Sequence, residues 1–145
     1  MLKRVAIASV LIVVTTLVAA CGSSDSSDDF VGVTWEWKSL AETAPANRSV
    51  VPEPQNYTLL FIDESLYSAT ADCNVLNGGY ERSGDSLTLS AGPSTLASCG
   101  EESLSEQYIA LLLEVDGFRI DGSELVLTYG GGAGEMTFAE AGSAS

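Results

Sequence analysis

The chain has 145 residues and a formal net charge of −14, with six Lys or Arg residues against twenty Asp or Glu residues. Such an acidic surface repels nucleic acids and anionic lipid headgroups, which argues against a nucleic-acid partner. The sequence contains no histidine, so a Ser-His-Asp mechanism is excluded and a zinc site would have few available ligands.

The chain begins with the pattern of an export signal. Lys3 and Arg4 precede an uncharged apolar run, Val5 to Ala20, which ends in small residues directly before Cys21. This run is shorter than the roughly 20 residues that a membrane-spanning helix needs, which disfavours a retained anchor helix. A cysteine at this point resembles the lipobox of bacterial lipoproteins, in which the thiol receives a diacylglycerol. We therefore expect residues 1–20 to be a signal peptide and Cys21 to be the lipidation site.

Residues 21–30, after the expected cleavage site, consist mainly of Ser and Asp before Phe30, so we expect a flexible tether between lipid and domain. A cation site at Asp25, Asp28 and Asp29 is the alternative, but it needs a fixed geometry that this composition does not supply. Gly22 is not the aspartate of inner-membrane retention signals, which favours the periplasmic face of the outer membrane in a Gram-negative source. The expected location is the cell envelope, with the lipid at Cys21 as the membrane contact and with no cofactor.

The other two cysteines, Cys73 and Cys99, form an even pair in an oxidising compartment, which favours a disulfide. Closing a loop of about 27 residues would stabilise the fold by roughly 3–4 kcal/mol in the chain-entropy model. A metal or redox pair is the alternative, and it lacks a C-x-x-C motif and a second pair of thiols.

Apolar runs of alternating or compact type predict a series of short strands in the domain, residues 31–140. The first, Val33 to Leu40, places Trp35 and Trp37 on one face, and the proline-containing segment that follows is expected to be a surface loop over residues 41–54. Further strands are predicted at 57–62 and 66–71, which pair as a hairpin, and at 79–82 and 87–89. Turns are predicted at 74–79, 83–86 and 91–93.

One helix is predicted, from Glu101 to Val115, because its apolar residues form one stripe: Leu104, Tyr108, Leu111, Leu112 and Val115. Ser103 and Glu106 have the spacing of a capping box, which would start the helix slightly later. Strands are then predicted at 118–120, 125–129 and 136–138, with a mobile glycine-rich hairpin loop at 130–134. The tail is expected to fray from Ala139 and to be disordered over residues 141–145.

These elements amount to about seven or eight short antiparallel strands and one helix. The fold class predicted is therefore α+β, mostly antiparallel β, with a small sheet that is sandwich-like or barrel-like. A single amphipathic helix of this kind is expected to pack on the sheet and to cover an open end or edge.

The segment Cys73-Asn74-Val75-Leu76-Asn77-Gly78-Gly79-Tyr80 resembles the C-N-x-[apolar]-x-G-x-Y motif of the META domain family, which includes HslJ. Gly32-x-Thr34-Trp35, the segment from Ser94 to Cys99, and the closing strands at 125–127 and 136–138 resemble further family segments in the right order. The resemblance implies a small β-rich fold and assigns the family motif to Trp35, Asn74, Gly78, Tyr80 and Thr95. It also implies a loose association with envelope stress, heat shock and resistance to some antibiotics. Two residues depart from the pattern: Asp72 replaces a usual glycine, and Ala97 replaces a frequent methionine.

No arrangement in the sequence indicates a catalytic residue. Lys38 could act as a base for the hydroxyl of Ser39, but adjacency in the sequence does not supply the geometry that this needs. Residues 130–134 lack the Lys and Ser/Thr of a phosphate-binding loop. Asn74 and Tyr80 allow two interpretations. Asn74 caps a turn while Tyr80 packs in the core, or the two form a polar patch beside the disulfide that binds a partner.

We therefore predict a non-enzymatic, membrane-anchored META-type lipoprotein of the bacterial envelope that binds an envelope protein or a small ligand, or that supports stress tolerance. The alternative is a small-molecule or lipid carrier, which would need a cavity lined by Trp35, Phe61, Leu111 and Phe138. An unrecognised hydrolase is a third possibility, and it would need a cleft with converging polar groups and shifted pKa values.

Overall fold

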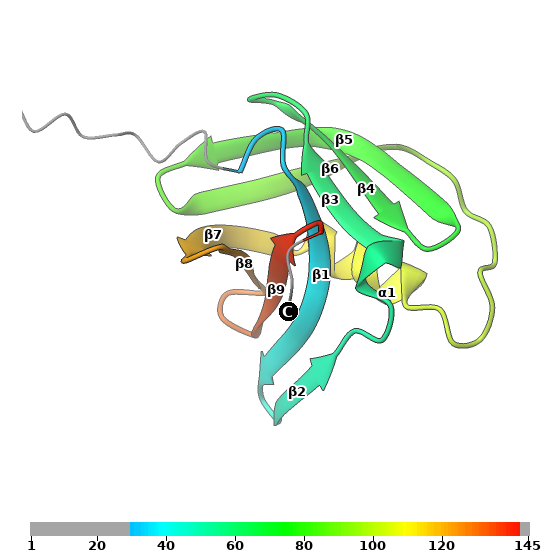
Figure 1. Cartoon of the computed structure of the whole chain (residues 1–145). Coiled ribbons are helices and arrows are strands. Elements are labelled where there is room, and N and C mark those ends of the chain that lie inside the picture. Colours follow the sequence, from blue (N-terminus) through cyan, green and yellow to red (C-terminus); the bar gives the residue numbers. More distant parts are fainter. Residues whose placement is uncertain (1–29, 143–145) are drawn as a thin grey trace, which may run out of the picture.

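The computed structural model describes residues 30–142, in which nine strands and one α-helix follow the chain order shown in Figure 1. The strands are β1 (Thr34–Thr43), β2 (Ala46–Val50), β3 (Tyr57–Phe61), β4 (Leu66–Ala71), β5 (Asn74–Ser83), β6 (Ser86–Ser94), β7 (Val115–Asp121), β8 (Glu124–Tyr129) and β9 (Gly134–Glu140). The helix α1 spans Ser105–Leu113, and a short 3-10 helix, η1, spans Pro54–Asn56. The predicted class, mostly antiparallel β with one helix, is confirmed.

All nine strands belong to one sheet whose order is β2-β1-β3-β4-β5-β6-β7-β8-β9, and every neighbouring pair is antiparallel. A further pairing between β1 and β9 closes the sheet into a ring. The ring is not a regular barrel, because β6 and β7 pair at a single position, Ser86 with Gly117. The edge of β1 that pairs with β3 at its start pairs with β2 at its end, so the β1–β2 hairpin extends beyond the ring.

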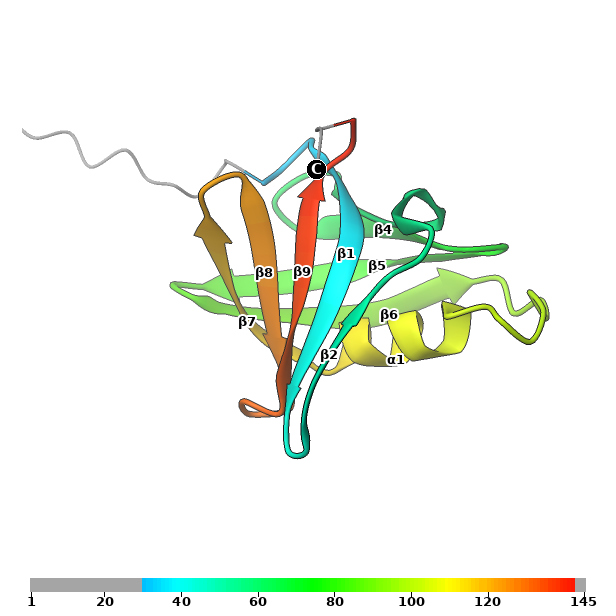
Figure 2. The same ribbon diagram turned by 60° about the horizontal axis from the view of Figure 1, so that its bottom comes forward.

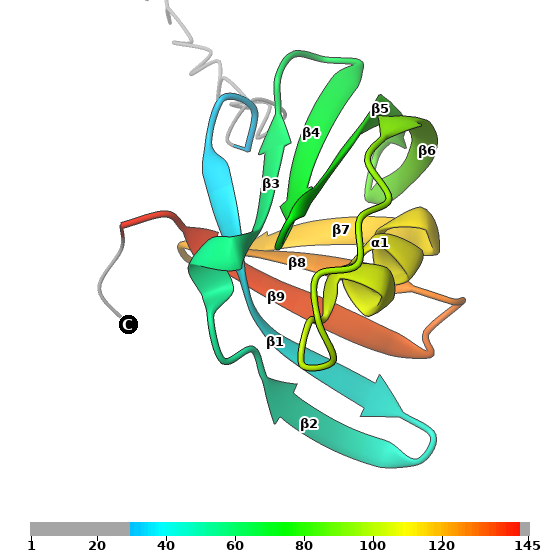
Figure 3. The same cartoon turned by 90° about the vertical axis from the view of Figure 1, so that its right-hand side faces the viewer.

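The ring has two layers of strands. Figure 2 shows β7, β8, β9, β1 and β2 in front of β4, β5 and β6, with the two groups running in different directions. Helix α1 lies against β4 and β6, and Figure 3 shows it between these strands and the β7–β9 layer. The helix therefore covers an open side of the ring, as its apolar stripe indicated.

Two groups of aromatic side chains fill the interior. The first, here called the terminal cluster, contains Phe30, Phe61, Tyr80 and Phe118. The ring of Phe30 lies 4.6 Å from that of Phe61 and 5.2 Å from that of Phe118, and the ring of Phe61 lies 4.8 Å from that of Tyr80.

The second group, here called the helix cluster, contains Trp37, Tyr57, Tyr108 and Phe138. Tyr108 comes from α1, and its ring stacks on that of Trp37 at 5.2 Å and meets that of Tyr57 edge-on at 5.7 Å. All the rings of both clusters are buried except that of Phe118, which is half-buried. Apolar and aromatic side chains therefore occupy the inside of the ring at both clusters.

The helix is shorter than the predicted span, Glu101 to Val115, at both of its ends. Glu101 and Glu102 form a turn, because the hydroxyl of Tyr57 accepts the backbone N–H of Leu104 at 2.9 Å and holds the chain before the helix. The backbone N–H of Ser105 donates to the Ser103 hydroxyl at 3.2 Å, in place of the predicted capping box. At the other end, Val115 already pairs with Tyr129 in the sheet. The contacts of the sheet thus set both limits of the helix.

The surface loop predicted over residues 41–54 is wrong in its first part. Strand β1 continues to Thr43, and β2 returns beside it after a turn that contains a cis peptide bond between Ala44 and Pro45. All five residues of β2 are exposed, so this strand leaves no apolar pattern that sequence reasoning could detect.

The turns predicted at 74–79 and 91–93 are also wrong, because β5 and β6 run through them. The actual turn before β5 contains Asp72, whose φ of 58° lies in the left-handed region that favours glycine. This conformation suits the glycine that the resemblance implies at this position, and Asp72 adopts it here. Gly92 and Pro93 are tolerated in β6 where the pairing with β5 shifts register between Leu76 and Gly78.

The C-terminal strand is longer than predicted. Ala139 and Glu140 belong to β9, and the backbone N–H of Ala141 donates to the carbonyl of Thr34 at 2.8 Å, so fraying does not begin at Ala139. Within residues 30–142, no helix has both the length and the apolar character needed to cross a bilayer. The expected signal peptide, Cys21 and most of the tether lie outside the described residues, as do residues 143–145.

Candidate functional site

Cys73 and Cys99 form a disulfide, as predicted, with their α-carbons 5.5 Å apart. Cys73 comes directly before β5, and Cys99 lies in the segment that joins β6 to α1. Cys73 is exposed and Cys99 is half-buried, so solvent reaches the bond. The disulfide fixes an irregular segment, residues 95–104, to the turn between β4 and β5.

Asn74, the residue after Cys73, is only 4% exposed, and both the nitrogen and the oxygen of its side-chain amide bind the segment 95–104. Its Nδ2 donates to the carbonyl of Ala97 at 2.9 Å and to the hydroxyl of Ser105 at 3.0 Å. Its Oδ1 accepts from the backbone N–H of Ala97 at 2.7 Å. The Cys99 sulfur lies 3.2 Å from Nδ2. Asn74 therefore joins β5, the disulfide segment and the first turn of α1.

Thr95 completes this network on the side of β6. Its hydroxyl donates to Oδ1 of Asn74 at 3.2 Å and accepts from the backbone N–H of Val75 at 3.0 Å. Its own backbone N–H donates to the carbonyl of Val75 at 3.0 Å. Asn74 and Thr95 are 21 residues apart in the sequence, but their side chains are hydrogen-bonded to each other. Together they hold the end of β6 and the disulfide segment against the start of β5.

The other motif residues also make internal contacts. A Cβ atom at Gly78 would clash with the carbonyl oxygen of Ser90 and with the ring of Tyr67, so the close approach of β5 and β6 requires glycine there. Tyr80 is buried, and its hydroxyl donates to the carbonyl of Asp63 at 2.6 Å. The indole N–H of Trp35 donates to the carbonyl of Phe30 at 3.1 Å. The structure brings Asn74 and Thr95 together, but it places Tyr80 and Trp35 in a different part of the core.

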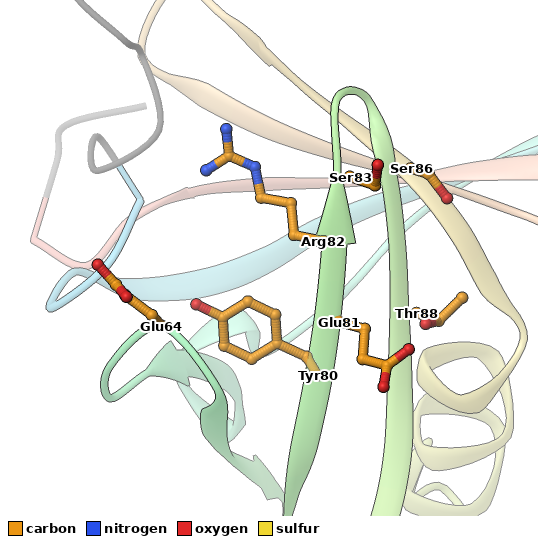
Figure 4. A pocket seen from close by; sticks show the side chains of 7 residues that line it. All are labelled: Glu64, Tyr80, Glu81, Arg82, Ser83, Ser86 and Thr88. Carbon is orange, nitrogen blue, oxygen red and sulfur yellow. The ribbon is translucent and has the colours of Figure 1, made fainter.

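An open hollow of about 480 Å³ lies beside Tyr80 and is drawn in Figure 4. In Figure 4, Tyr80 and Arg82 extend to the same side of β5 as Glu64, whereas Glu81 and Thr88 lie on the other side, as alternation along β5 requires for Glu81. The Arg82 guanidinium lies 5.1 Å from the ring centre of Phe118 and 5.5 Å from that of Phe30. The polar groups of this hollow are therefore divided between two sides of the β5–β6 hairpin, and the arginine supports the terminal cluster.

The pKa values that depart from their ordinary range have structural causes. Burial raises the pKa of Tyr67 to about 12 and that of Tyr108 well above its usual value. The backbone N–H groups of Ser65 and Leu66 lower the pKa of Asp63, whose carboxylate holds the β3–β4 turn. The hydrogen bond from Arg119 lowers the pKa of Glu135 at an exposed ion pair. These shifts report packing, a turn and a salt bridge, and none lies in a cleft with a nucleophile.

The glycine-rich loop, residues 130–134, joins β8 to β9 as a hairpin, as predicted. The carboxylate of Asp116 accepts from the backbone N–H of Gly131 and, at 2.9 Å, from the hydroxyl of Thr128. On its other side the hydroxyl of Thr43 donates to the carbonyls of Gly132 and Ala133, each at 3.1 Å. These hydrogen bonds attach the loop to Asp116 on one side and to Thr43 on the other. The mobility of the loop stays a prediction. Within residues 30–142, no three acidic or cysteine side chains are grouped as metal ligands would be.

A groove of about 410 Å³ runs between residues 96–98 and helix α1. Leu96 on one wall is 88% exposed, and Ile109 and Ala110 line the other wall. Asn74 and Ser105 form its floor with their polar atoms already hydrogen-bonded. Sequence reasoning missed this groove, because a single leucine in an irregular segment gives no periodic signal.

The sequence pattern of the META domain matches residues 28–143, which is most of the chain and includes all the motif residues. The chain belongs to the META domain family. A comparison with curated proteins gave no match.

The META fold of this chain is similar to two solved structures. One is a DUF4847 family protein from Bacteroides vulgatus ATCC 8482, with a TM-score of 0.60 and 11% identity over 77% of this chain and 95% of that one. The other is a protein from Burkholderia xenovorans solved by NMR, with a TM-score of 0.62 and 18% identity over 81% of this chain and 88% of that one. At these identities the likeness concerns the fold alone.

Proposed function

We propose that this META-domain chain is a non-enzymatic binding module of the bacterial cell envelope, held at the membrane by lipid on Cys21. The observation that supports this most directly is the use of the family motif. Asn74 and Thr95 hold an exposed segment in place, while Trp35, Gly78 and Tyr80 build the core. A motif used in this way maintains a presented surface, which suits binding rather than catalysis.

The packing argues against the two alternatives. Of the residues that would line a carrier's cavity, Trp35, Phe61 and Phe138 are at most 4% exposed and pack among other core side chains. The fourth, Leu111, is half-buried and packs against the same core. A hydrolase would need converging polar groups, whereas the polar groups beside Tyr80 are divided between two sides of the β5–β6 hairpin (Figure 4). Native mass spectrometry of the purified protein tests the carrier directly, since a carrier would retain a bound lipid or small molecule.

The anchor is tested by expressing the full chain in bacteria with a clickable palmitate analogue and comparing it with the Cys21→Ala variant. We expect label and membrane fractionation for the unchanged chain, and loss of both for Cys21→Ala. The Cys99→Ala variant is the matched control, because it removes a cysteine of the domain and leaves the signal intact. Equal labelling of the unchanged chain and Cys21→Ala would refute lipid attachment at this residue.

A further inference from the structure

The groove beside α1 combines an apolar lining with a fixed shape. Leu96 stands 88% exposed above it, and Ile109 and Ala110 of the helix form the facing apolar wall. The disulfide and the bonds of Asn74 hold the wall that carries Leu96. Its volume of about 410 Å³ lies within the usual range of ligand clefts. An apolar side chain of a partner would therefore meet a preformed site.

The charges around this groove have one sign. Glu106 lines it, Glu101 and Glu102 form the turn that joins its two walls, and Asp72 precedes the cysteine that is bonded to Cys99. The sequence has no Lys or Arg between Arg48 and Arg82, or between Arg82 and Arg119, so the segments that build the groove contain no cation. Negative charge around apolar walls attracts a positively charged partner and repels an acidic one.

We propose that this groove binds a cationic amphipathic peptide segment, which places apolar side chains against Leu96 and Ile109 and Lys or Arg side chains against the surrounding carboxylates. The inference rests on the proposed function and names the chemistry of the bound partner. Anionic membrane is a poor occupant, because the same carboxylates repel its headgroups. An extended acidic chain, including a second copy of this protein, is repelled for the same reason.

The test uses the mature chain, residues 21–145, with Cys21→Ser, so that acylation and its outcome do not enter the measurement. The probe is a helical peptide of about 14 residues made of Lys and Leu in an amphipathic pattern. Two peptides of equal length serve as controls: one replaces Leu by Ser, and the other replaces Lys by Glu. Amide chemical shifts of the labelled protein are recorded at physiological salt as each peptide is added.

We expect the Lys/Leu peptide to shift the amides of residues 96–98 and 105–110 at micromolar concentration, and both control peptides to bind at least about tenfold more weakly. Leu96→Ser should weaken binding roughly tenfold, because it removes an exposed apolar contact at no cost to the core. Glu106→Gln should weaken it about two- to threefold, with a smaller effect at high salt. Val50→Ser and Glu124→Gln are matched exposed controls on β2 and β8, and they should leave binding unchanged.

Three results would overturn the proposal: no binding up to about 1 mM peptide, equal binding of the Lys/Ser peptide, or equal loss in Val50→Ser and Leu96→Ser. The second would show attraction to the overall negative charge, and the third would place the contact elsewhere. Because the protein used carries no lipid, none of these results bears on the anchor, which the palmitate experiment tests separately.

Discussion

The two aromatic clusters of this META domain are closed by different means. At the helix cluster, a disulfide and the amide of Asn74 fix the chain before α1, and the helix then inserts Tyr108. At the terminal cluster, Phe30 inserts a single ring from the segment before β1. Its noncovalent supports include the bond from Trp35 and the Arg82 guanidinium.

The difference separates two tasks. Covalent and polar bonds at the helix cluster hold an irregular, exposed segment in one conformation, which is what a binding surface needs. The terminal cluster packs the segment before β1 through the ring of Phe30 and, within residues 30–142, carries no covalent link. We therefore expect the two ends to respond differently to mutation, reduction and pH.

The largest effect is expected for Phe30→Ala. Removing a fully buried phenyl ring leaves a cavity among three other aromatic rings, which should lower the free energy of unfolding by about 4 kcal/mol. Urea unfolding measures the loss, and Val50→Ala, at an exposed site, should stay within about 0.5 kcal/mol of the unchanged protein. A loss below about 1 kcal/mol would show that the terminal cluster closes without Phe30.

Removing the disulfide should have the next largest effect. Cys73→Ser combined with Cys99→Ser removes a covalent link between residues 26 apart, which should lower the free energy of unfolding by about 3 kcal/mol. Hydrogen exchange should become faster mainly in residues 95–113, and less so near Phe30. The unchanged protein treated with a reductant is the control and should match the double variant. Faster exchange near Phe30 alone would contradict the division between the two ends.

Asn74→Ala should cost about 2 kcal/mol, because it removes the partner of the Ala97 backbone N–H and leaves the buried hydroxyl of Ser105 without its donor. Asn77→Ala changes an exposed residue of the same strand and should be nearly neutral. Hydrogen exchange adds a local measurement, since the Ala97 amide should lose protection in the first variant alone. Retained protection there would mean that the disulfide holds the segment without Asn74.

Alkaline pH should destabilise the helix side of the core by a smaller amount. The folded protein raises the pKa of Tyr67 from 10 to about 12, so the folded state keeps a proton that the unfolded state releases. This contribution is complete below pH 10 and is lost as the pH rises through about 12. Tyr67→Phe should therefore give a shallower fall in stability between these pH values, measured by urea unfolding at each pH. An unchanged slope would exclude Tyr67 as a source of the alkaline effect.

The smallest effect is expected for Tyr108→Phe. Its buried hydroxyl has no hydrogen-bond partner among residues 30–142, so its removal should change stability by less than about 1 kcal/mol and in the favourable direction. Tyr57→Phe is the matched control in the same cluster, and it should cost about 1 kcal/mol because it removes the bond from Leu104. A greater loss for Tyr108→Phe would indicate a bound water on this hydroxyl.

Local patterns in the sequence predicted the elements that bury one face. Trp35 and Trp37 alternate along β1, and the β3–β4 and β7–β8 hairpins have compact apolar strands between short turns. The wrong predictions have a common cause. Strand β2 has no buried residue, and glycines in β5 and β6 suggested turns although close packing of the strands required them. The sequence shows where a glycine lies but not which neighbouring atoms leave no room for a side chain there.

The site could be predicted only in part. The expectation of an oxidising compartment, together with an even pair of cysteines, was enough to predict the disulfide between Cys73 and Cys99. The sequence could not show that Asn74 binds Ala97 and Ser105, because those contacts depend on where the disulfide segment lies in space. For the same reason Leu96 gave no sign of the groove it borders, since exposure of a side chain is a property of the folded molecule.

The pairing of β1 with β9 has a consequence for biogenesis. The ring closes when β1, the first strand of the domain, pairs with β9, the last strand. Strand β9 is synthesised about a hundred residues after β1. A ribosome-bound chain that has not released Glu140 therefore cannot complete the hydrogen bonds between β1 and β9. The neighbouring hairpins can pair earlier, so closure of the ring is the step that waits for the C-terminal strand.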